Sequence, residues 1–468
     1  MRPRNQPARD RLLPLLGRLG PSSAAALAQA LDVSVPTLHR LLQEQAGQVL
    51  SAGKARRARH ALRRGLRGVV GDSPLYQVDV EGRAEQVGQL ALLRPQGAWL
   101  QLPDGSWPVP EASRDGWWDG LPYPLLDMRP EGYMGRQFAR RQHQALAVPA
   151  DPETWSDDDV VHVLSQRGWD ASGQWILGEP AMALWQAERL APATPLRPAV
   201  QGAAYAALAD EAVASGVPGS SAAGEFPKFA ALRELDGSAT PHVLVKFSGA
   251  DAGSSTVQRW ADLLVCEHLA LACAGTLPGA EPTRSRVLGH AGRTFLEVER
   301  FDRHGRWGRS GLVSLGTLDA ALLGDGSSDW TRLAARLAAE QWLAAEALPR
   351  VEVLWWFGRL IANTDMHTGN LSFRPAPTSN AAAKAGLQLA PAYDMLPMLY
   401  APLAGGELPP RQFEPALPLP PQRTVWQTAC TAALAFWQMA AEDSRISPAF
   451  RATCKQNRQR LEAVAALA

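Results

Sequence analysis

Strand-like patterns are frequent in the chain up to about residue 300, and helix-like patterns dominate after it. Residues 242–247 (His-Val-Leu-Val-Lys-Phe) and 293–299 (Arg-Thr-Phe-Leu-Glu-Val-Glu) predict strands, because β-branched and aromatic residues are concentrated in them. Residues 256–274, 330–348 and 351–361 predict helices, because their apolar positions recur with helical spacing. A β-rich part followed by a helical part indicates an α+β fold class.

The first 70 residues have a pattern of their own. Residues 22–31 and 35–42 predict two helices separated by a three-residue turn. Two helices joined in this way, with a proline near the start of the second, are typical of a helix-turn-helix. An extended run at 49–51 and a basic stretch at 53–64 follow, which favours a wing behind the second helix. We therefore expect an all-α winged helix-turn-helix domain over residues 1–70.

Charge is distributed unevenly along the chain. The whole chain has a formal net charge of +1, but residues 1–70 contain 13 Arg or Lys and three acidic residues, a net of +10. The remaining 398 residues carry a net charge of −9. A basic segment on an acidic body predicts that this segment meets a polyanion such as duplex DNA. The residues expected to face DNA lie on the second helix and on the wing: Thr37, His39, Arg40, Lys54, Arg56, Arg57 and Arg59. The alternative is a small helical bundle with a solvated basic face.

The segment from Ile361 to Phe373 contains the clearest candidate chemistry. It is a polar turn between an apolar helix-like run and a short β-type run, and it contains Asp365 and Asn370. Their spacing of five residues is that of the protein-kinase catalytic loop, in which the Asp accepts the proton of the substrate hydroxyl and the Asn binds a metal ion. Asp394 follows a second apolar run, and Asn and Asp oxygens are hard ligands suited to a metal that bridges ATP phosphates.

These residues predict phosphoryl transfer from ATP. Asp365, Asn370 and Asp394 are the expected catalytic residues, and Asn370 and Asp394 are the expected ligands of Mg²⁺. Taken singly, an Asp in a loop is more often a cap or a turn residue than a catalyst. Their order and their positions on neighbouring elements favour the catalytic interpretation.

Two of the chain's five lysines, Lys228 and Lys246, lie in segments that favour chemistry, although the chain contains 42 arginines. Lys246 lies inside an apolar strand, where an unpaired ammonium is costly, so it requires an anionic partner. In kinases that partner is the nucleotide's phosphates together with a helix glutamate, and Glu267 is the candidate here. The alternative is a solvent-exposed lysine on an edge strand.

Two further segments could contact a nucleotide. A loop of small residues at 219–224 precedes Lys228 and could lie over phosphates through its backbone N–H groups. The strand at 293–299 ends in charged residues and could offer backbone groups to an adenine edge. Asp302 would then be close enough for a ribose hydroxyl or for a salt bridge. A charged hairpin end is the alternative for this segment.

Taken together, these segments resemble the HipA family of serine/threonine kinases, the toxin component of a bacterial persistence toxin–antitoxin pair. The matching motifs are Ser221-Ala-Ala-Gly-Glu-Phe-Pro-Lys228, Val245-Lys246, Val298-Glu-Arg-Phe-Asp-Arg303, Asn363-Thr-Asp-Met-His-Thr-Gly-Asn370 and Tyr393-Asp394. They occur in the family's order over roughly residues 72–468. The resemblance implies a bilobed protein-kinase-like fold, with a β-rich N-terminal lobe over residues 71–300 and a helical catalytic lobe over residues 301–468.

The resemblance also implies roles for single residues. Asp365 matches the catalytic base, Asn370 and Asp394 match the Mg²⁺ ligands, and Lys246 matches the lysine that binds the ATP phosphates. Ser221, with Ser220 as the second choice, matches a serine that the family toxin autophosphorylates, while Glu299 and Phe301 match the hinge that holds adenine. The expected nucleotide-binding residues are therefore Ser221, Ala222, Ala223, Gly224, Lys228, Lys246, Glu299, Phe301 and Asp302.

Two features depart from the family pattern. Gly369 stands where the toxin has a lysine in its catalytic loop, and residues 1–70 supply a basic domain where the toxin depends on a separate DNA-binding antitoxin. We expect an ATP- and Mg²⁺-dependent serine/threonine protein kinase that autophosphorylates and binds DNA, with a protein substrate and an antitoxin as expected partners. The alternative is a DNA-binding transcriptional regulator whose inactive kinase fold senses nucleotide. A third interpretation, a metal-dependent hydrolase or nuclease that uses Asp365, His367 and Asp394, leaves Lys246 unexplained.

Cysteine usage and hydropathy indicate the compartment. The four cysteines have no paired spacing, which predicts reduced core thiols. The N-terminus has no signal-peptide pattern. The longest uncharged run, residues 424–441, contains Thr and Gln and so predicts a buried helix rather than a membrane span. We therefore expect a cytoplasmic protein without a membrane segment.

Overall fold

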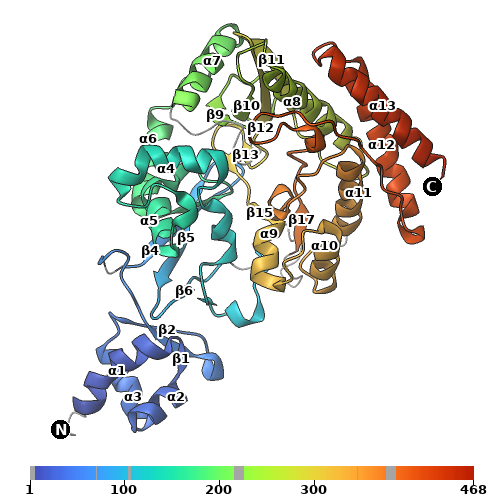
Figure 1. Cartoon of the computed structure of the whole chain (residues 1–468). Helices are drawn as coiled ribbons and strands as arrows, with labels where there is room; N and C mark the ends of the chain where they lie inside the picture. Colours follow the sequence, from blue (N-terminus) through green and yellow to red (C-terminus); the bar gives the residue numbers. More distant parts are fainter. Residues whose placement is uncertain are drawn as a thin grey trace.

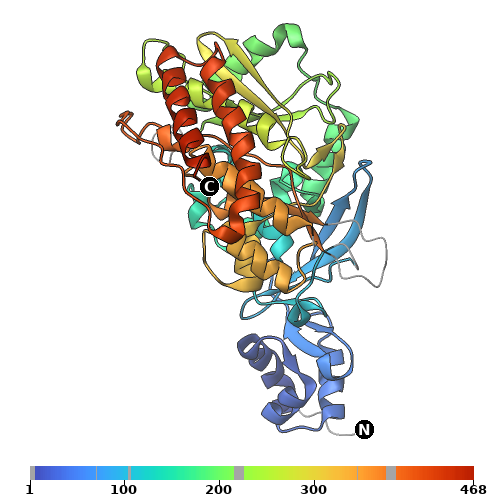
Figure 2. The same ribbon diagram turned by 90° about the vertical axis from the view of Figure 1, so that its right-hand side faces the viewer.

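The computed structural model describes residues 6–69, 71–103, 107–214, 226–344, 346–375 and 386–467. Within them the chain forms an N-terminal unit, a middle unit with its own five-stranded sheet, and a larger part built from a four-stranded sheet and a helical lobe (Figure 1). Figure 1 and Figure 2 both show the N-terminal unit projecting from the rest of the molecule. The fold is of α+β type, as predicted from the sequence.

The N-terminal unit contains helices packed beside a small antiparallel sheet. The helices are α1 (Gln6–Leu19), α2 (Ala24–Leu31) and α3 (Val35–Glu44), and the strands in sheet order are β1 (Ser22–Ser23), β3 (Arg59–Leu62) and β2 (Val49–Ala52). Ser23 and Ser34 cap α2 and α3, because each hydroxyl accepts a hydrogen bond from a backbone N–H of the first turn. Leu12, Leu27 and Leu38 share one buried core. Both predicted helices and the turn between them are therefore present. The all-α class predicted for residues 1–70 is wrong, because strands β1, β3 and β2 pair into a sheet within this unit.

Main-chain bonds and apolar packing fix the N-terminal unit to the middle unit. The Arg64 N–H donates to the Leu92 carbonyl, and the Arg94 N–H donates to the Leu62 carbonyl, both at 2.9 Å. A buried apolar cluster spans the same junction and contains Leu50, Ala61, Ala91, Leu93 and Trp117. The two units therefore meet through a packed interface as well as through the covalent chain.

Ion pairs reinforce this interface. Arginines from the basic segment reach carboxylates of the following residues: Arg57 pairs with Asp115 (3.1 Å), Arg63 with Asp72 (3.1 Å), Arg67 with Asp159 (2.6 Å), and Arg64 with Asp158. We call these four the interdomain ion pairs. Part of the positive charge counted in residues 1–70 therefore binds the acidic body and is not directed at an external polyanion.

The middle unit is an antiparallel sheet flanked by helices. In sheet order the strands are β7 (Trp117–Trp118), β6 (Ala98–Trp99), β5 (Ala84–Leu92), β4 (Ser73–Val78) and β8 (Trp175–Leu177), and the helices are α4 (Gly132–Leu146), α5 (Asp157–Arg167) and α6 (Glu179–Leu190). Helix α5 begins with a capping box, in which Ser156 and Asp159 each bond the other's backbone N–H. This cap fixes the acidic first turn of α5 that receives two of the interdomain ion pairs.

The sheet that carries the expected lysines is covered on both faces. Its antiparallel strands are, in order, β11 (Ser285–His290), β12 (Arg293–Glu299), β10 (His242–Phe247) and β9 (Lys228–Leu232). Helix α7 (Pro198–Ala214) packs Tyr205 against Phe229 and Phe295 on one face, and α8 (Ser255–Ala274) lies on the other. Side chains alternate along a strand, so the residues of β10 that pack toward α7, such as Val245, leave Lys246 facing α8.

The helical lobe follows this sheet in the chain. It begins with β13 (Arg303–His304), β14 (Gly308–Arg309), β15 (Val313–Ser314) and α9 (Leu315–Leu318), and it continues with α10 (Trp330–Ala339), α11 (Ala347–Leu360), β16 (Ser372–Pro375), β17 (Leu387–Leu389), α12 (Arg423–Glu442) and α13 (Pro448–Ala465). Strands β15, β16 and β17 form one antiparallel sheet, which holds the turn between α11 and β16.

The single helix predicted over residues 330–348 is wrong. Helix α10 ends at Ala339, Gln341 adopts a left-handed backbone with φ of 63°, and α11 begins at Ala347. After Gln341 the chain pairs with a distant segment: Leu343 bridges Leu387, and the Ala344 N–H donates to the Leu387 carbonyl at 2.8 Å. A contact between residues far apart in the sequence therefore overrides the local helical pattern.

The cysteine and membrane predictions concern the core of the molecule. Cys266, Cys273, Cys430 and Cys454 are all buried and free. The uncharged run at 424–441 lies within α12. Among the described residues, no helix combines the length and the apolar character needed to cross a membrane.

Candidate active site

Lys246 is held between two carboxylates. Its ammonium donates to both oxygens of Glu267, at 2.7 and 2.9 Å, and also bonds Oδ1 of Asp394. The side chains of Lys246 and Glu267 are buried, at 9% and 1% exposure, whereas that of Asp394 is 30% exposed. The glutamate predicted as the lysine's partner is therefore the partner, and the exposed-lysine alternative is excluded for Lys246.

The charges of this cluster shift the pKa values of its members. Burial lowers the pKa of Lys246, but Asp394 and Glu267 outweigh this effect and hold it above its ordinary value. Burial raises the pKa of Asp394, but Lys246 and Lys228 outweigh it and lower the pKa to about 2. Burial raises the pKa of Glu267 to about 7, although Lys246 opposes the shift. Asp394 therefore stays ionised at neutral pH, and Glu267 is the carboxylate of the cluster that takes up a proton.

Lys228 lies beside this cluster. It is the cross-strand neighbour of Lys246 in the pairing of β9 with β10. Its charge acts on both Asp394 and Glu267. Two ammonium groups on one side of a sheet repel each other, so anions on that side stabilise both. Lys228 therefore lies on the same face of the sheet as Lys246, and its contact with a nucleotide stays a prediction.

The loop between α11 and β16 is held by hydrogen bonds to its own backbone. Asn370 is buried, and its Nδ2 donates to the Asp365 carbonyl at 2.8 Å. Asn363 accepts from the Asp365 N–H at 3.0 Å and donates to the Asp394 carbonyl at 3.2 Å. Met366 packs so closely against Gly358 that a Cβ on residue 358 would lie 2.6 Å from the sulfur of Met366. The side chain of Asp365 itself is exposed.

The loop also brings the two expected metal ligands to neighbouring segments. Asn363 links the loop to Asp394 through the bond to the Asp394 carbonyl. Within the described residues, neither Oδ1 of Asn370 nor Oδ2 of Asp394 takes part in a hydrogen bond. Amide and carboxylate oxygens with spare bonding capacity suit Mg²⁺, which keeps few protein ligands and completes its shell with phosphates and water. The donor set therefore fits Mg²⁺ brought in with ATP.

A site built from His367 has less support. The Nδ1 of His367 accepts from the Gly369 N–H at 3.1 Å, which commits this nitrogen to the turn. In the part of the chain that the structure describes, no group of three or more His, Cys, Asp or Glu residues could hold a metal ion. Asp365, His367 and Asp394 are therefore not brought together as a metal-ligand cluster among the described residues.

The segment expected to hold adenine follows β12. Phe301 lies with its ring 5.7 Å from the ring of Tyr393, the residue before Asp394. Glu299 ion-pairs with Arg233 at 2.7 Å, and its N–H donates to the Arg284 carbonyl at 2.9 Å. The carboxylate of Glu299 is therefore structural, and the Phe301 ring is the part of this segment that lies near the cluster around Lys246.

Asp302 is committed to a buried ion cluster. Its oxygens accept from Arg300 at 3.1 and 3.2 Å, from Arg303 at 2.6 Å and from the Gly173 N–H at 3.0 Å. Asp170 binds the same two arginines, at 3.1 and 2.9 Å. We call these four charged side chains the hinge cluster. Since every oxygen of Asp302 has partners, the prediction of Asp302 as a ribose-binding residue is wrong, and the salt-bridge alternative is the one observed.

Several predicted residues lie elsewhere or outside the described part. Ser220, Ser221, Ala222, Ala223 and Gly224 lie outside the described residues. In the N-terminal unit, His39 and Arg40 on α3 and Lys54, Arg56 and Arg59 after β2 are exposed, and none of the four basic ones forms an ion pair with a described residue. Thr37 instead bonds Ser34 at 2.9 Å as part of the helix cap, and Arg57 belongs to the interdomain ion pairs.

Sequence reasoning missed residues that shape the site. Asn363, Tyr393 and Asp170 all bond backbone or charged groups of the expected site. Asn363 and Tyr393 are inside the motifs quoted for the family resemblance, and a polar side chain at each of these positions is a signal that could have found them. Asp170 is about 130 residues from its arginines in the chain, and nothing in its local sequence indicates the contact.

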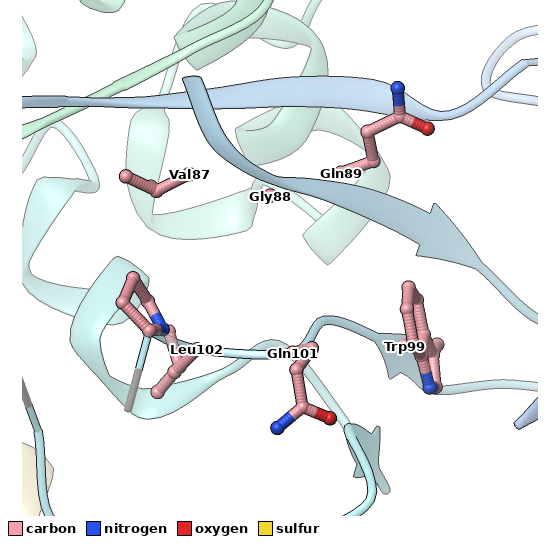
Figure 3. Close-up of a pocket in the computed structure, with 7 residues that line it drawn as sticks. Val87, Gly88, Gln89, Trp99, Gln101 and Leu102 are labelled. Atoms are coloured by element: carbon pink, nitrogen blue, oxygen red, sulfur yellow. The ribbon is translucent and has the colours of Figure 1, made fainter. Parts of the chain in front are cut away.

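A cavity of about 430 Å³ lies away from this site, in the middle unit. Figure 3 shows it between β5 and the segment that begins with β6. The lining residues are Val87, Gly88, Gln89, Trp99, Gln101, Leu102 and Pro103. None of these lining residues, which belong to the described part of the chain, is charged or was predicted for catalysis.

Comparisons with known proteins agree with the sequence motifs. A model of the HipA-like C-terminal domain matches residues 220–465, and a model of the middle domain of YjjJ-like toxins matches residues 70–186. Toxin YjjJ of Escherichia coli (strain K12) is 37% identical over 434 residues, which are 92% of this chain and 93% of that protein. The chain belongs to the HipA-like toxin family.

A solved structure shows the same fold. A chain of the Shewanella oneidensis MR-1 complex of the toxin–antitoxin system HipA, HipB and its operator DNA matches with a TM-score of 0.50. The match covers 84% of this chain and 96% of that chain at 14% sequence identity. The bilobed protein-kinase-like fold predicted from the family resemblance is therefore confirmed.

Proposed function

We propose that the chain is an ATP- and Mg²⁺-dependent serine/threonine protein kinase. The observation that carries the proposal is the contact of Lys246 with both Glu267 and Asp394 beside the loop of Asp365 and Asn370. In protein kinases the pair of a strand lysine and a helix glutamate places the ammonium against the nucleotide phosphates. The same lysine in this chain is already oriented by a buried glutamate.

Each of these residues has a separate role in the proposed phosphoryl transfer. Lys246 neutralises charge on the phosphates, and Asn370 and Asp394 would hold Mg²⁺, which when bound neutralises the charge on the transferred group. The exposed carboxylate of Asp365 accepts the proton of the attacking serine or threonine hydroxyl. Because Lys246 bonds Asp394, the ammonium that would meet phosphate and the carboxylate that would hold the metal lie side by side.

Labelling with ATP tests the proposal. The full chain is incubated with γ-labelled ATP and Mg²⁺, and the label is mapped by mass spectrometry. Asp365→Asn should lower transfer by roughly 100-fold or more, because it removes the general base, while nucleotide binding is retained. Asp119→Asn, an exposed carboxylate remote from the loop, is the matched control. Nucleotide binding without transfer in the wild type would favour the regulator with an inactive kinase fold, the alternative that Gly369 supports.

We propose Ser221, with Ser220 as the second choice, as the autophosphorylated residue. The motif Ser221-Ala-Ala-Gly-Glu-Phe-Pro-Lys228 places it shortly before Lys228, which lies beside the cluster around Lys246. A phosphate adds a charge of about −1.5 to −2, which would repel the phosphates of ATP and lower its affinity. In the same labelling experiment, a Ser221→Ala chain with as much label on the same peptide as the wild type would exclude this serine.

We further propose that residues 1–70 bind duplex DNA as a winged helix-turn-helix. The exposed Arg40, Lys54, Arg56 and Arg59 support this, because none is paired with a described carboxylate. Replacing Arg56 and Arg59 together by Ala should weaken binding of the full chain to all sequences alike. The slope of the logarithm of the binding constant against the logarithm of salt concentration should become shallower by about 0.9 for each lost phosphate contact.

The interdomain ion pairs supply a matched control for the DNA experiment. Arg57→Ala should reduce the salt slope less than either Arg56→Ala or Arg59→Ala, because Asp115 already binds its guanidinium. Changes at Thr37 or Arg40 should alter which DNA sequences the chain prefers, since these residues lie early on α3. If the full chain does not shift duplex DNA even at low salt, the exposed cations are only a solvated face.

An antitoxin is a further proposed partner. The support is that a relative is named as a toxin and that the solved structure with the same fold contains HipA, HipB and operator DNA. Co-purification of the tagged chain from its own cells, with a DNase-treated sample as control, tests this. A protein retained after DNase treatment would be a direct partner, and loss of every co-purified protein would indicate association through DNA alone.

A further inference from the structure

The hydroxyl of Tyr393 takes part in two hydrogen bonds at the end of the catalytic loop. It lies 2.6 Å from the Gly369 carbonyl and 2.7 Å from the hydroxyl of Ser372. A carbonyl can only accept, and a phenol has one hydrogen to donate. Tyr393 therefore donates to Gly369, and Ser372 donates to Tyr393. The direct contact with the catalytic loop is the bond to Gly369.

The backbone on both sides of Tyr393 is fixed. Thr283 donates to the Ala392 carbonyl at 2.5 Å, and Asn363 donates to the Asp394 carbonyl at 3.2 Å. The ring of Tyr393 packs near the ring of Phe301. Because the backbone and the ring of Tyr393 are both restrained, its hydroxyl has a defined position. We call the hydrogen bond from this hydroxyl to the Gly369 carbonyl the strut.

The strut joins the segments that hold the two proposed metal ligands. Gly369 precedes Asn370, and Tyr393 precedes Asp394. Gly369 has no side chain to restrain its backbone, so the hydrogen bond to its carbonyl is an external restraint on this part of the loop. We propose that Tyr393 is a positioning residue that sets the separation of Asn370 from Asp394 for Mg²⁺. This inference rests on the proposed kinase function, because it assigns those two residues to the metal.

The test distinguishes the contribution of the Tyr393 hydroxyl from that of its ring. Tyr393→Phe removes the bond to Gly369 and keeps the packing on Phe301. Ser372→Ala removes the other hydrogen bond and leaves the donation to Gly369 intact. Tyr76→Phe is the matched control, because its hydroxyl also bonds a single acceptor, Glu179 at 2.7 Å, but on the middle unit. The measurement is the Mg²⁺ concentration that gives half-maximal binding of ATP to the full chain.

Tyr393→Phe should raise that Mg²⁺ concentration roughly three- to tenfold, as expected for one lost hydrogen bond. Ser372→Ala should raise it less, and Tyr76→Phe should leave it unchanged. Affinity for ATP without Mg²⁺ should be the same in all four chains. An unchanged Mg²⁺ requirement in Tyr393→Phe overturns the inference.

A second measurement needs neither metal nor nucleotide. The Asn370 N–H donates to the His367 carbonyl at 3.0 Å within the turn that Tyr393 restrains. Its amide hydrogen exchange should be several-fold faster in Tyr393→Phe than in the wild type, and unchanged in Tyr76→Phe. Faster exchange together with no Mg²⁺-dependent ATP binding in the wild type would overturn the proposed function and leave the strut in place. Equal exchange would overturn the strut itself.

Discussion

The cluster around Lys246 and the hinge cluster are both groups of partly or fully buried charges, yet they differ in how their carboxylates are bonded. In the hinge cluster both oxygens of Asp302 have partners, and these partners are two arginines and a backbone N–H. In the cluster around Lys246, Oδ2 of Asp394 has no hydrogen bond among the described residues, and its side chain is 30% exposed.

The backbone shows the same difference. Asp394 is in the left-handed region, with φ of 52°, a conformation that costs energy for a residue with a Cβ. Asp302 has no such strain in its backbone. Saturated bonds on a relaxed backbone indicate a structural cluster, whereas spare bonding capacity on a strained backbone indicates a binding site. Charge and burial alone do not separate the two.

Replacing Asp394 should have the largest effect on ligand binding. Asp394→Asn removes the charge but suits the left-handed backbone, because asparagine tolerates that conformation. We expect Mg²⁺-dependent binding of ATP to weaken by about 100-fold, equivalent to about 2.8 kcal/mol. Isothermal titration with ATP in the presence and absence of Mg²⁺ measures this. Normal Mg²⁺-dependent binding would remove Asp394 from the proposed metal ligands and end the distinction between the clusters.

Replacing Asp302 should act on stability and leave the ligand site alone. Asp302→Asn leaves the buried Arg303 and its neighbour Arg300 without half of their compensating charge, which should cost about 3 kcal/mol of unfolding free energy. Urea denaturation measures the cost, and Asp119→Asn should change it by no more than about 0.5 kcal/mol. A stable Asp302→Asn chain with weakened ATP binding would restore the ribose assignment.

Glu267 should give the smallest effect, visible in its pH dependence. Its ordinary pKa of 4.5 is raised to about 7 in the folded chain by burial, so the folded state keeps a proton that the unfolded state loses. This contribution to stability is complete below pH 4.5 and is lost as pH rises through 7. The unfolding free energy of the wild type minus that of Glu267→Gln should therefore fall with rising pH, by at most about 1.4 kcal/mol per pH unit.

The measurement for Glu267 is urea denaturation of both chains at pH 5, 6, 7 and 8 without nucleotide or Mg²⁺. Asp394 does not titrate between pH 5 and 8, so it does not contribute to the pH dependence measured there. Its lowered pKa of about 2 means that its own contribution is present above 3.8 and is lost only as pH falls toward 2. A difference between the two chains that is constant from pH 5 to 8 would show that Glu267 is ionised throughout.

The local parts of the fold were predictable because short-range patterns determine them. Strand β10 occupies the predicted residues 242–247, and the capped helices α2 and α3 lie where serine caps and a proline mark them. Lys246 and Glu267 were also predictable as a pair, because a lysine in an apolar strand requires an anion and the next helix offers one.

The rest depended on contacts between distant residues. The break after Ala339 results from pairing with Leu387, and the use of Asp302 results from Arg300 and Arg303 meeting Asp170 of the middle unit. The basic segment was predicted as one polyanion-binding surface, but Arg57 and Arg64 bind carboxylates of the body. A sequence shows the sign of each charge, and only the fold shows which charges are already neutralised.

The packed junction between the N-terminal unit and the middle unit has a consequence for geometry on DNA. Backbone hydrogen bonds, an apolar cluster and the interdomain ion pairs restrict rotation of the N-terminal unit relative to the middle unit. A chain that holds DNA through α3 would therefore present the proposed catalytic loop between α11 and β16 at one fixed angle around the double helix. Its access to a substrate bound to the same duplex would then vary with helical phase, and would recur with every 10 to 10.5 base pairs inserted between the two sites.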